Sequence, residues 1–190
     1  MNTNKRTQTI VGLGLLTAIV IVLQELAVMI RPTGIFSISL VLIPIVIGAA
    51  LYGWKAGAWL GFVFGLIVMI SGDANAFMVV NAPGTIITVL VKGTCAGLVA
   101  GLVYRAIAKK NHYLAVVATA VACPCVNTGI FLIGCYLFFM DTIQTWAGDT
   151  NVLTFMIVGL VGVNFLIEMA VNIVLSSVIV QIVKISKKTA

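Results

Sequence analysis

The stretch SISLVLIPIVIGAALYGWKAGAWLGFVFGLI, residues 37–67, decides the class of fold, because it is almost entirely apolar and carries one charged residue, Lys55. The segment LYGWKAG near its middle is a tight connection that divides the stretch into two apolar runs. We expect these runs to form two membrane-spanning helices over about residues 36–52 and 55–70. Each is short beside the roughly 20 residues of an average span.

The rest of the chain has the same apolar character. Of its 190 residues, 62% are hydrophobic and 8% are charged, and the mean hydropathy is +1.21, whereas about a quarter of the residues in a soluble domain are charged. The composition therefore predicts an integral membrane protein with a single transmembrane domain, residues 1–190. The net charge of +6 does not indicate a nucleic-acid partner, because the basic residues gather at the ends of the apolar runs.

Proline, glycine and charged residues bound six apolar runs, which predict an all-α integral membrane fold of six transmembrane helices. The expected spans are about 9–30, 36–52, 55–70, 83–105, 113–140 and 153–183. The first run continues past the length of the apolar region of a signal peptide, so we interpret it as a retained helix. The last run is longer than a bilayer requires, which predicts a tilted or protruding helix.

The charged residues alternate between the two ends of these spans, and this pattern sets the orientation. One side takes Lys5, Arg6, Lys55, Arg105, Lys109, Lys110, Lys184, Lys187 and Lys188, and the other takes Arg31, Asp73, Asp141 and Asp149. Basic residues mark the cytoplasmic side of a membrane. Both chain termini are therefore expected in the cytoplasm, and the acidic loops outside.

Small residues recur at every fourth position on three of the spans. The stripes are Gly57, Gly61 and Gly65 on the third span, Gly93, Gly97 and Gly101 on the fourth, and Gly14 and Ala18 on the first. Such stripes let helices approach closely in a membrane. We expect the two longer stripes to serve packing within this chain, and the stripe on the first span to dock on a separate membrane subunit.

Polar side chains inside the spans form the candidate site, because a charge near the bilayer centre costs roughly 2.5–3.5 kcal/mol on insertion scales. Lys92 and Glu168 are the two deepest charges. Polar groups from the fourth, fifth and sixth spans are expected to converge in the outer half of the bundle, where they suit a small polar ligand. The candidate substrate-binding residues are Asn81, Thr85, Thr88, Lys92, Asn127, Asn164 and Glu168. An ion pair between Lys92 and Glu168 that only stabilises the bundle is the alternative, and Asn172 is expected to form a helix–helix hydrogen bond.

Two outer loops flank this region, with the sequences MIRPTGIF and SGDANAFMVVNAPGT. The second contains a short apolar segment between glycine and proline, which predicts a lid that folds over the pocket. An ordinary interfacial loop is the alternative. The candidate lid residues of the two loops are Arg31, Asp73, Asn75 and Phe77.

The chain carries no motif of an enzyme or of a nucleotide-binding protein. It has no P-loop, no HExxH and no GxSxG, and its single histidine, His112, lies in a basic inner loop. The sequence therefore predicts neither catalysis nor a cofactor, and no histidine-based metal site. The segment Cys123-Pro124-Cys125 leaves one alternative open, the transport of a soft metal ion, because paired thiolates bind such ions.

Several of these segments resemble one family. Residues 37–67, with an early proline and a small-residue turn before a glycine-rich helix, resemble the second and third helices of the substrate-binding (S) components of energy-coupling factor (ECF) transporters. The segment LVKGTCAGLVAGLVYRAI, residues 90–107, resembles the fourth helix of that family. Gly14 and Ala18 match the spacing of two alanines on its first helix, with glycine in place of the first. The resemblance extends over nearly the whole chain.

The resemblance implies a multi-pass subunit of a bacterial or archaeal cell membrane that binds a water-soluble vitamin from outside and closes its outer loops over it. It also implies the partners. These are a transmembrane coupling protein of the EcfT type, on which Gly14 and Ala18 would dock, and two cytoplasmic ATPases that would supply ATP hydrolysis.

The polar residues give a first indication of the ligand. Lys92, with the neighbouring amides and hydroxyls, suits a small molecule with a carboxylate or phosphate, and pantothenate, which some family members carry, is the first candidate. The aromatic residues expected at the pocket are few (Phe77, Phe131, Tyr136 and Phe165), so a large flavin is disfavoured. A self-sufficient small secondary transporter or channel is the alternative function, although no internal repeat supports it.

Overall fold

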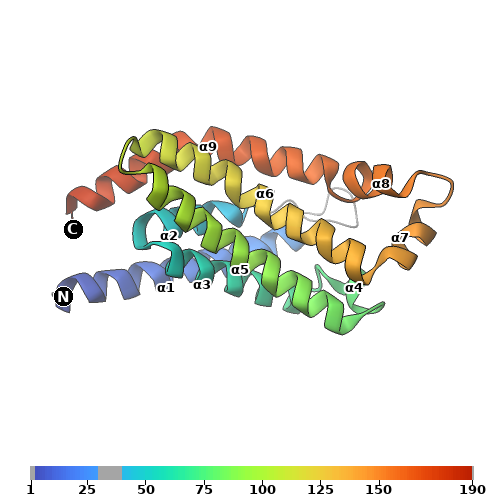
Figure 1. The fold of residues 1–190 in the computed structure, drawn as a ribbon. Helices are drawn as coiled ribbons and strands as arrows, with labels where there is room; N and C mark the ends of the chain where they lie inside the picture. Colours follow the sequence, from blue (N-terminus) through green and yellow to red (C-terminus); the bar gives the residue numbers. More distant parts are fainter. Residues whose placement is uncertain (1–2, 30–39, 190) are drawn as a thin grey trace.

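The computed structural model describes the backbone of residues 3–29 and 40–189, and the side chains of residues 6–29 and 40–185. Every regular element within these ranges is a helix, in agreement with the predicted all-α class. Figure 1 shows the long helices lying side by side along one axis. The elements are α1 (Thr3–Met29), α2 (Leu42–Tyr52), α3 (Trp54–Ile70), α4 (Asn75–Met78), α5 (Ala82–Ile107), α6 (His112–Phe138), α7 (Met140–Ala147), α8 (Val152–Thr154), the π-helix η1 (Phe155–Gly162) and α9 (Val163–Thr189).

Local sequence explains where these helices begin and end. Gly53 separates α2 from α3 with a φ of 89°, a conformation that glycine adopts without steric cost. The side chain of Asn81 accepts a hydrogen bond from the Gly84 N–H at 3.0 Å and so caps α5. Asn111 caps α6 in the same way. These caps satisfy backbone N–H groups that have no partner inside the helix. The positions of the two asparagines therefore help to fix where α5 and α6 begin.

Four helical stretches are long and apolar enough to cross a membrane, judged by length and composition within the described part of the chain. They are Arg6–Met29, Ala82–Ile107, His112–Phe138 and Val152–Ile185. The helices α2 and α3 are also apolar but shorter. Most of the expected span boundaries agree closely with these helices. The expected start of the second span, residue 36, lies outside the described residues.

The glycine stripes on α3 and α5 face each other and bring the two backbones into contact. A Cβ atom built on Gly57 or Gly61 collides with the carbonyl group of Gly97 or Gly93, and one built on Gly65 would lie 2.9 Å from the carbonyl oxygen of Val89. No side chain larger than hydrogen fits between these two helices at such positions. The expectation that these stripes serve packing within the chain is confirmed.

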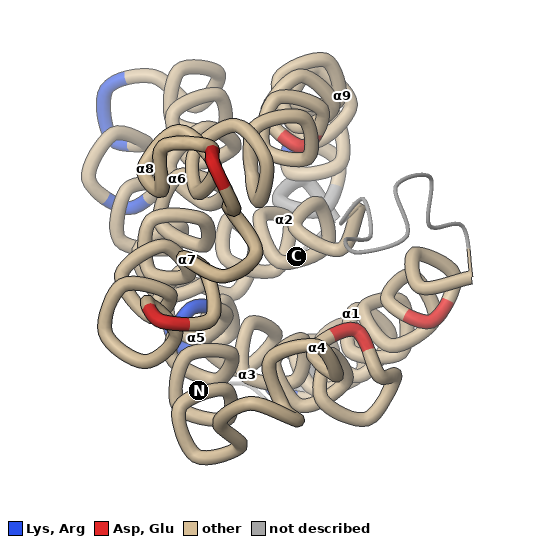
Figure 2. The backbone as a smooth tube through the Cα atoms, turned by 90° about the vertical axis from the view of Figure 1, so that its right-hand side faces the viewer, with Lys and Arg blue, Asp and Glu red and all other residues tan. Residues whose placement is uncertain are grey.

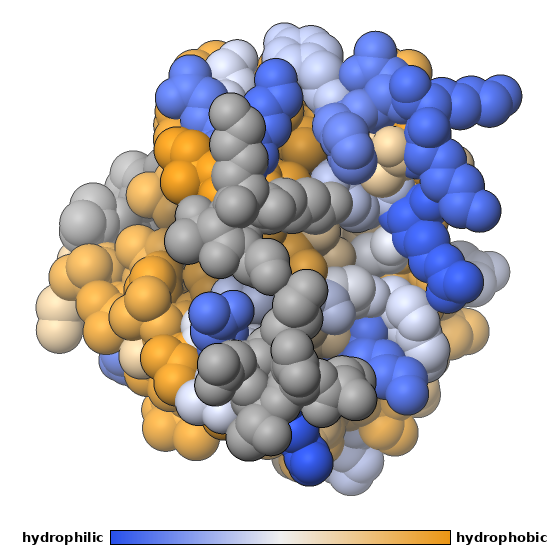
Figure 3. Space-filling model, turned by 90° about the vertical axis from the view of Figure 1, so that its left-hand side faces the viewer, coloured by the Kyte–Doolittle hydropathy of each residue, from blue (hydrophilic) through white to orange (hydrophobic). Residues whose placement is uncertain are grey.

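Charge and polarity divide the bundle along its axis. The first and last described residues lie at the same end, together with the α2–α3 and α5–α6 connections (Figure 1). The hydrophilic residues that gather at this end are visible in Figure 3. The described basic residues Arg6, Lys55, Arg105, Lys109, Lys110 and Lys184 are all exposed. Figure 2 shows acidic residues on α7 and near α8, at the opposite end.

Within the described part of the chain, two apolar clusters form the interior. The larger one surrounds α2, whose Leu42, Ile45, Val46 and Ala49 are completely buried. The smaller one gathers at the end that bears α4 and α7, where its buried members are Phe77, Cys135, Phe139, Ile143, Met156 and Leu160.

The expected fifth span, 113–140, stops earlier than predicted. The helix α6 ends at Phe138, and the chain continues as the separate short helix α7, whose Ile143 and Ala147 are buried against the smaller cluster. The expected sixth span begins as α8 and continues through the π-helical segment η1 before α9. Segments of π-helix are rare and occur frequently at functional sites.

Candidate functional site

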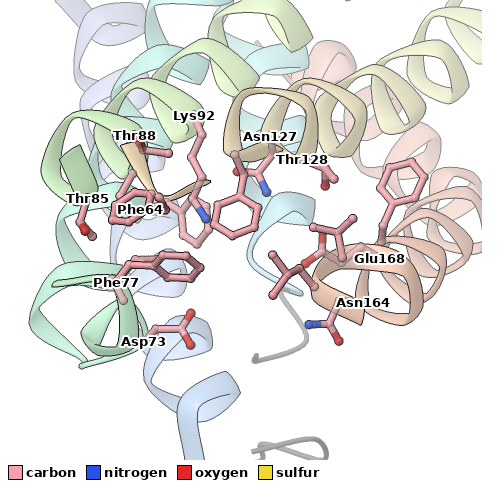
Figure 4. Close-up of a pocket in the computed structure, with 18 residues that line it drawn as sticks. Phe64, Asp73, Phe77, Thr85, Thr88, Lys92, Asn127, Thr128, Asn164 and Glu168 are labelled. Carbon is pink, nitrogen blue, oxygen red and sulfur yellow. The ribbon is translucent and has the colours of Figure 1, made fainter. Parts of the chain in front are cut away.

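A cavity lies among α3, α5, α6 and α9 (Figure 4). Its lining includes Phe77 of α4, a helix at the end of the bundle away from the termini (Figure 1). Its empty space is about 790 Å³, which includes the open mouth. The lining residues are Phe64, Val68, Asp73, Ala74, Phe77, Thr85, Thr88, Val89, Lys92, Asn127, Thr128, Phe131, Phe139, Leu160, Val161, Asn164, Phe165 and Glu168.

One wall of the cavity is the polar face of α5. Thr85, Thr88 and Lys92 follow one another at helical spacing, as the sequence predicts, and all three line the cavity. The Thr85 hydroxyl donates to the carbonyl of Asn81 at 2.8 Å. The Thr88 hydroxyl is buried and has no hydrogen-bond partner among the described residues. A buried hydroxyl without a partner costs about 1–3 kcal/mol, so Thr88 offers an unused donor and acceptor at the wall.

Lys92 extends from α5 into the cavity, across from Glu168 on α9 (Figure 4). Its ammonium nitrogen lies 5.8 Å from the ring centre of Phe64 and 5.2 Å from that of Phe131. Cations are attracted to the faces of aromatic rings at such distances. The carboxylates of Asp73 and Glu168 attract the charge of Lys92. No carboxylate within the described part of the chain forms a salt bridge with it, so the alternative of a direct Lys92–Glu168 ion pair is not seen in the structure.

The opposite wall is formed by α6, η1 and α9. Asn127 on α6 is 7% exposed, and its side-chain oxygen has no hydrogen-bond partner within the described ranges. Glu168 is also 7% exposed, and Asn164 lies one turn further along the same wall. The side-chain nitrogen of Asn172 donates to the backbone carbonyl of Glu168 at 2.8 Å, so this bond stays within α9 and does not link two helices.

Aromatic side chains form the apolar part of the lining. Phe77 on α4 makes edge-to-face contacts with Phe131, Phe139 and Trp146, at ring-centre distances of 5.6, 5.0 and 5.5 Å. Such contacts stabilise a pair by about 0.5–1.5 kcal/mol beyond the burial of area. Phe77 therefore holds the segment between α3 and α5 against α6 and α7.

Most of the residues singled out from the sequence meet at this cavity. Six of the seven candidate substrate-binding residues line it, as do Asp73 and Phe77 of the candidate lid. Asn81 is not among the lining residues, because its side chain caps α5. Asn75 is exposed and does not line the cavity, and Arg31 lies outside the described residues. The roles of all these residues in binding stay predictions.

Sequence reasoning missed part of the lining. Phe64 and Phe139 were not expected there, whereas Tyr136, which was, is 61% exposed. The cavity is thus more aromatic than expected, and this weakens the argument against a flavin. Helical spacing places Phe64 on the face of α3 that contacts α5, but this could be used only if α5 were already known to be the neighbouring helix. Phe139 follows the end of α6, where helical periodicity gives no signal.

The other candidate sites are found elsewhere. Gly14 and Ala18 are exposed on α1, and no atom lies within 4 Å of a Cβ built on Gly14. Cys123 is buried and Cys125 is exposed, so the two thiols of the proposed soft-metal pair lie in different surroundings. Among the described side chains, those of residues 6–29 and 40–185, no three of His, Cys, Asp or Glu are placed to hold a metal ion together.

Comparisons with known proteins place the chain in a family. The family model for the ECF transporter, substrate-specific component, matches residues 8–180. Pantothenic acid transporter PanT of Lactococcus lactis subsp. cremoris (strain MG1363) is 26% identical over 156 residues, which are 75% of this chain and 75% of that protein. No solved structure matches the chain significantly.

The family match extends over most of the chain and agrees with the apolar helices of a multi-pass membrane protein. Proteins of this kind are subunits of membrane transporters and not enzymes. The chain belongs to the substrate-specific components of ECF transporters.

Proposed function

We propose that this chain is the pantothenate-binding subunit of an ECF-type vitamin importer. The observation that carries the proposal is the cavity itself, which is lined by the cation of Lys92, by the two aromatic rings beside it, and by polar atoms of Thr88 and Asn127 that have no hydrogen-bond partner among the described residues. The relative that transports pantothenic acid supports the choice of ligand.

Pantothenate has polar and apolar groups that match the polar and the aromatic parts of the cavity lining. Its carboxylate would pair with Lys92 in a charge-assisted hydrogen bond, which is about twice as strong as a neutral one. Its amide N–H and two hydroxyls would donate to the side-chain oxygen of Asn127 and to Glu168, which are acceptors. Its dimethyl-substituted carbon would contact the rings of Phe77 and Phe131. The carboxylates of Asp73 and Glu168 would repel the anionic end and so favour one orientation.

We further propose that the chain crosses the cell membrane six times, with α2 and α3 as the two short crossings and both termini in the cytoplasm. The common position of the termini at one end supports this topology, as does the exposure of basic residues there (Figures 1 and 3). Basic residues are retained on the cytoplasmic side. The cavity would then open to the outside, where the vitamin is captured.

The partners in this proposal are a transmembrane coupling protein and two cytoplasmic ATPases. The coupling protein would dock on α1 at Gly14 and Ala18, because these small residues are exposed and leave room for a second helix. The segment between α3 and α5, which includes Asp73 and Phe77, would act as the lid. ATP hydrolysis by the partners would drive uptake of the bound vitamin.

The test is a direct binding measurement on the purified chain in detergent. Radiolabelled pantothenate is added, bound label is separated by gel filtration, and unlabelled pantothenate, riboflavin, biotin and thiamine are offered as competitors. Saturable binding that only pantothenate displaces would support the proposal. Absence of saturable pantothenate binding, together with saturable binding of labelled riboflavin, would refute the choice of ligand, and the aromatic lining would then explain the result.

Reconstitution tests the need for partners. Vesicles that contain the chain alone should take up no labelled pantothenate, whereas vesicles that also contain the coupling protein and ATPases should accumulate it when ATP is present. Uptake by the chain alone would instead identify a self-sufficient transporter.

A further inference from the structure

Gln24 is the one completely buried polar residue among the described side chains of α1. The other buried residues of that helix are Leu16, Val20 and Ala27, so α1 contacts the bundle through a narrow stripe at helical spacing. An amide in an apolar stripe is costly to bury unless it forms hydrogen bonds. Packing alone would be served better by leucine, so the position of Gln24 points to a specific partner.

That partner is Asp73, on the segment that enters the cavity. The side-chain nitrogen of Gln24 donates to the Asp73 carboxylate at 3.1 Å across 49 positions of sequence. The assignment of nitrogen rather than oxygen to this contact is required by chemistry, because an amide oxygen would repel a carboxylate. The bond joins α1 to residues 71–81, and Asp73 lines the cavity and attracts Lys92.

The same helix exposes a different face to its surroundings. Gly14 and Ala18 are exposed on α1, away from the buried stripe that ends near Gln24. A second hydrogen bond links Thr17 to Trp59 of α3 at 3.3 Å, nearer the middle of the helix. The helix α1 thus has an accessible face along part of its length, and near its outer end it forms a hydrogen bond to the cavity wall through Gln24.

We infer that Gln24 is a positioning residue that fastens the 71–81 segment to α1, so that displacement of α1 releases this wall of the cavity. The part played by the coupling protein rests on the function proposed above. Its contact with the exposed face of α1 would shift the helix, break the Gln24–Asp73 bond and free the ligand. In the isolated chain the bond holds this wall in place against α1.

Hydrogen–deuterium exchange of the unliganded chain in detergent tests this directly. The variant is Gln24→Leu, which keeps the size and helix propensity of the side chain but removes the donor. The matched control is Gln8→Leu, the same change at an exposed position of α1. Amides of residues 71–81 should exchange about tenfold faster in Gln24→Leu, since a hydrogen bond to a charged group is lost. They should not change in the control.

The internal reference is α5, which packs on α3 through the glycine contacts. Faster exchange confined to residues 71–81 supports the inference, while equal acceleration in 71–81 and 82–107 would show that Gln24 only stabilises the bundle, and would overturn it. Unchanged exchange in 71–81 would overturn it as well.

Addition of the coupling protein and ATPases provides the second readout. In the wild-type chain their binding should accelerate exchange in residues 71–81, and in Gln24→Leu it should add little, because the bond is already absent. An equal acceleration in both chains would show that the partner does not act through the Gln24–Asp73 bond, and would overturn this part of the inference. Because these measurements use unliganded protein, a failure to bind labelled pantothenate would refute the ligand assignment and leave this comparison intact.

Discussion

Replacement of Lys92 by methionine is the change with the largest expected effect on binding. Methionine keeps the length of the side chain and its contacts with the rings of Phe64 and Phe131, but it removes the cation. A bound carboxylate would then face Asp73 and Glu168 without a positive charge from α5 to offset them. Loss of one partner from a buried charge pair costs about 2–5 kcal/mol. A loss of about 3–4 kcal/mol corresponds to a fall in affinity of roughly 10²- to 10³-fold.

The assay is titration calorimetry with two ligands, pantothenate and its uncharged alcohol analogue pantothenol. The wild-type chain should prefer pantothenate by roughly the factor that the substitution removes, and Lys92→Met should bind the two compounds about equally. This comparison isolates the contact between the cation and the carboxylate, because any general damage to the cavity lowers both affinities. If Lys92→Met binds pantothenate within about threefold of wild type, or keeps the preference, Lys92 does not bind the carboxylate.

Three further predictions follow from the packing and the unpartnered groups. Gly61→Ala places a methyl group against the Gly93 carbonyl and should lower stability by about 1–3 kcal/mol in thermal or denaturant unfolding. The control Gly129→Ala has no atom within 4 Å of the new Cβ and should leave stability unchanged. Equal losses of stability in the two variants would contradict the close contact. Asn127→Leu removes a buried side-chain oxygen that has no hydrogen-bond partner among the described residues. The unliganded chain should therefore unfold at an unchanged or higher temperature, while its affinity for pantothenate should fall about tenfold. Unchanged affinity would show that Asn127 does not bind the ligand. Gly14→Leu should leave pantothenate binding intact and reduce co-purification of the coupling protein, and normal co-purification would place docking elsewhere.

Helical spacing and composition were sufficient to predict much of the bundle. Thr85, Thr88 and Lys92 meet on one face because their spacing matches the helical repeat, and this holds whatever helix lies opposite. The glycine stripes of α3 and α5 likewise predict close approach, because small residues at every fourth position have few other uses in an apolar helix.

The aromatic half of the cavity depends on which helices become neighbours, and the sequence of one helix does not contain that information. Phe64 reaches Lys92 only because α3 and α5 lie in contact, and Tyr136 points outward because of the rotation of α6 in the bundle. The break after Phe138 was also missed, since apolar residues continue across it and α7 is held by tertiary burial of Ile143. Asn81 had a readable signal, because asparagine followed by proline and glycine is a helix start.

The contact between the backbones of α3 and α5 restricts which walls of the site can adapt to a different ligand. Gly93, which follows Lys92 directly, touches Gly61, so the backbone that carries the cation has no free volume in which to adjust. The end of the cavity that we propose to bind the anion is therefore preorganised, and recognition of a carboxylate there would carry little reorganisation cost. Any adaptation to the shape of a vitamin must come from the opposite wall and from the segment between α3 and α5. A change of ligand within this architecture would then require substitutions on α6, η1 and α9, while the α3–α5 pair stays as it is.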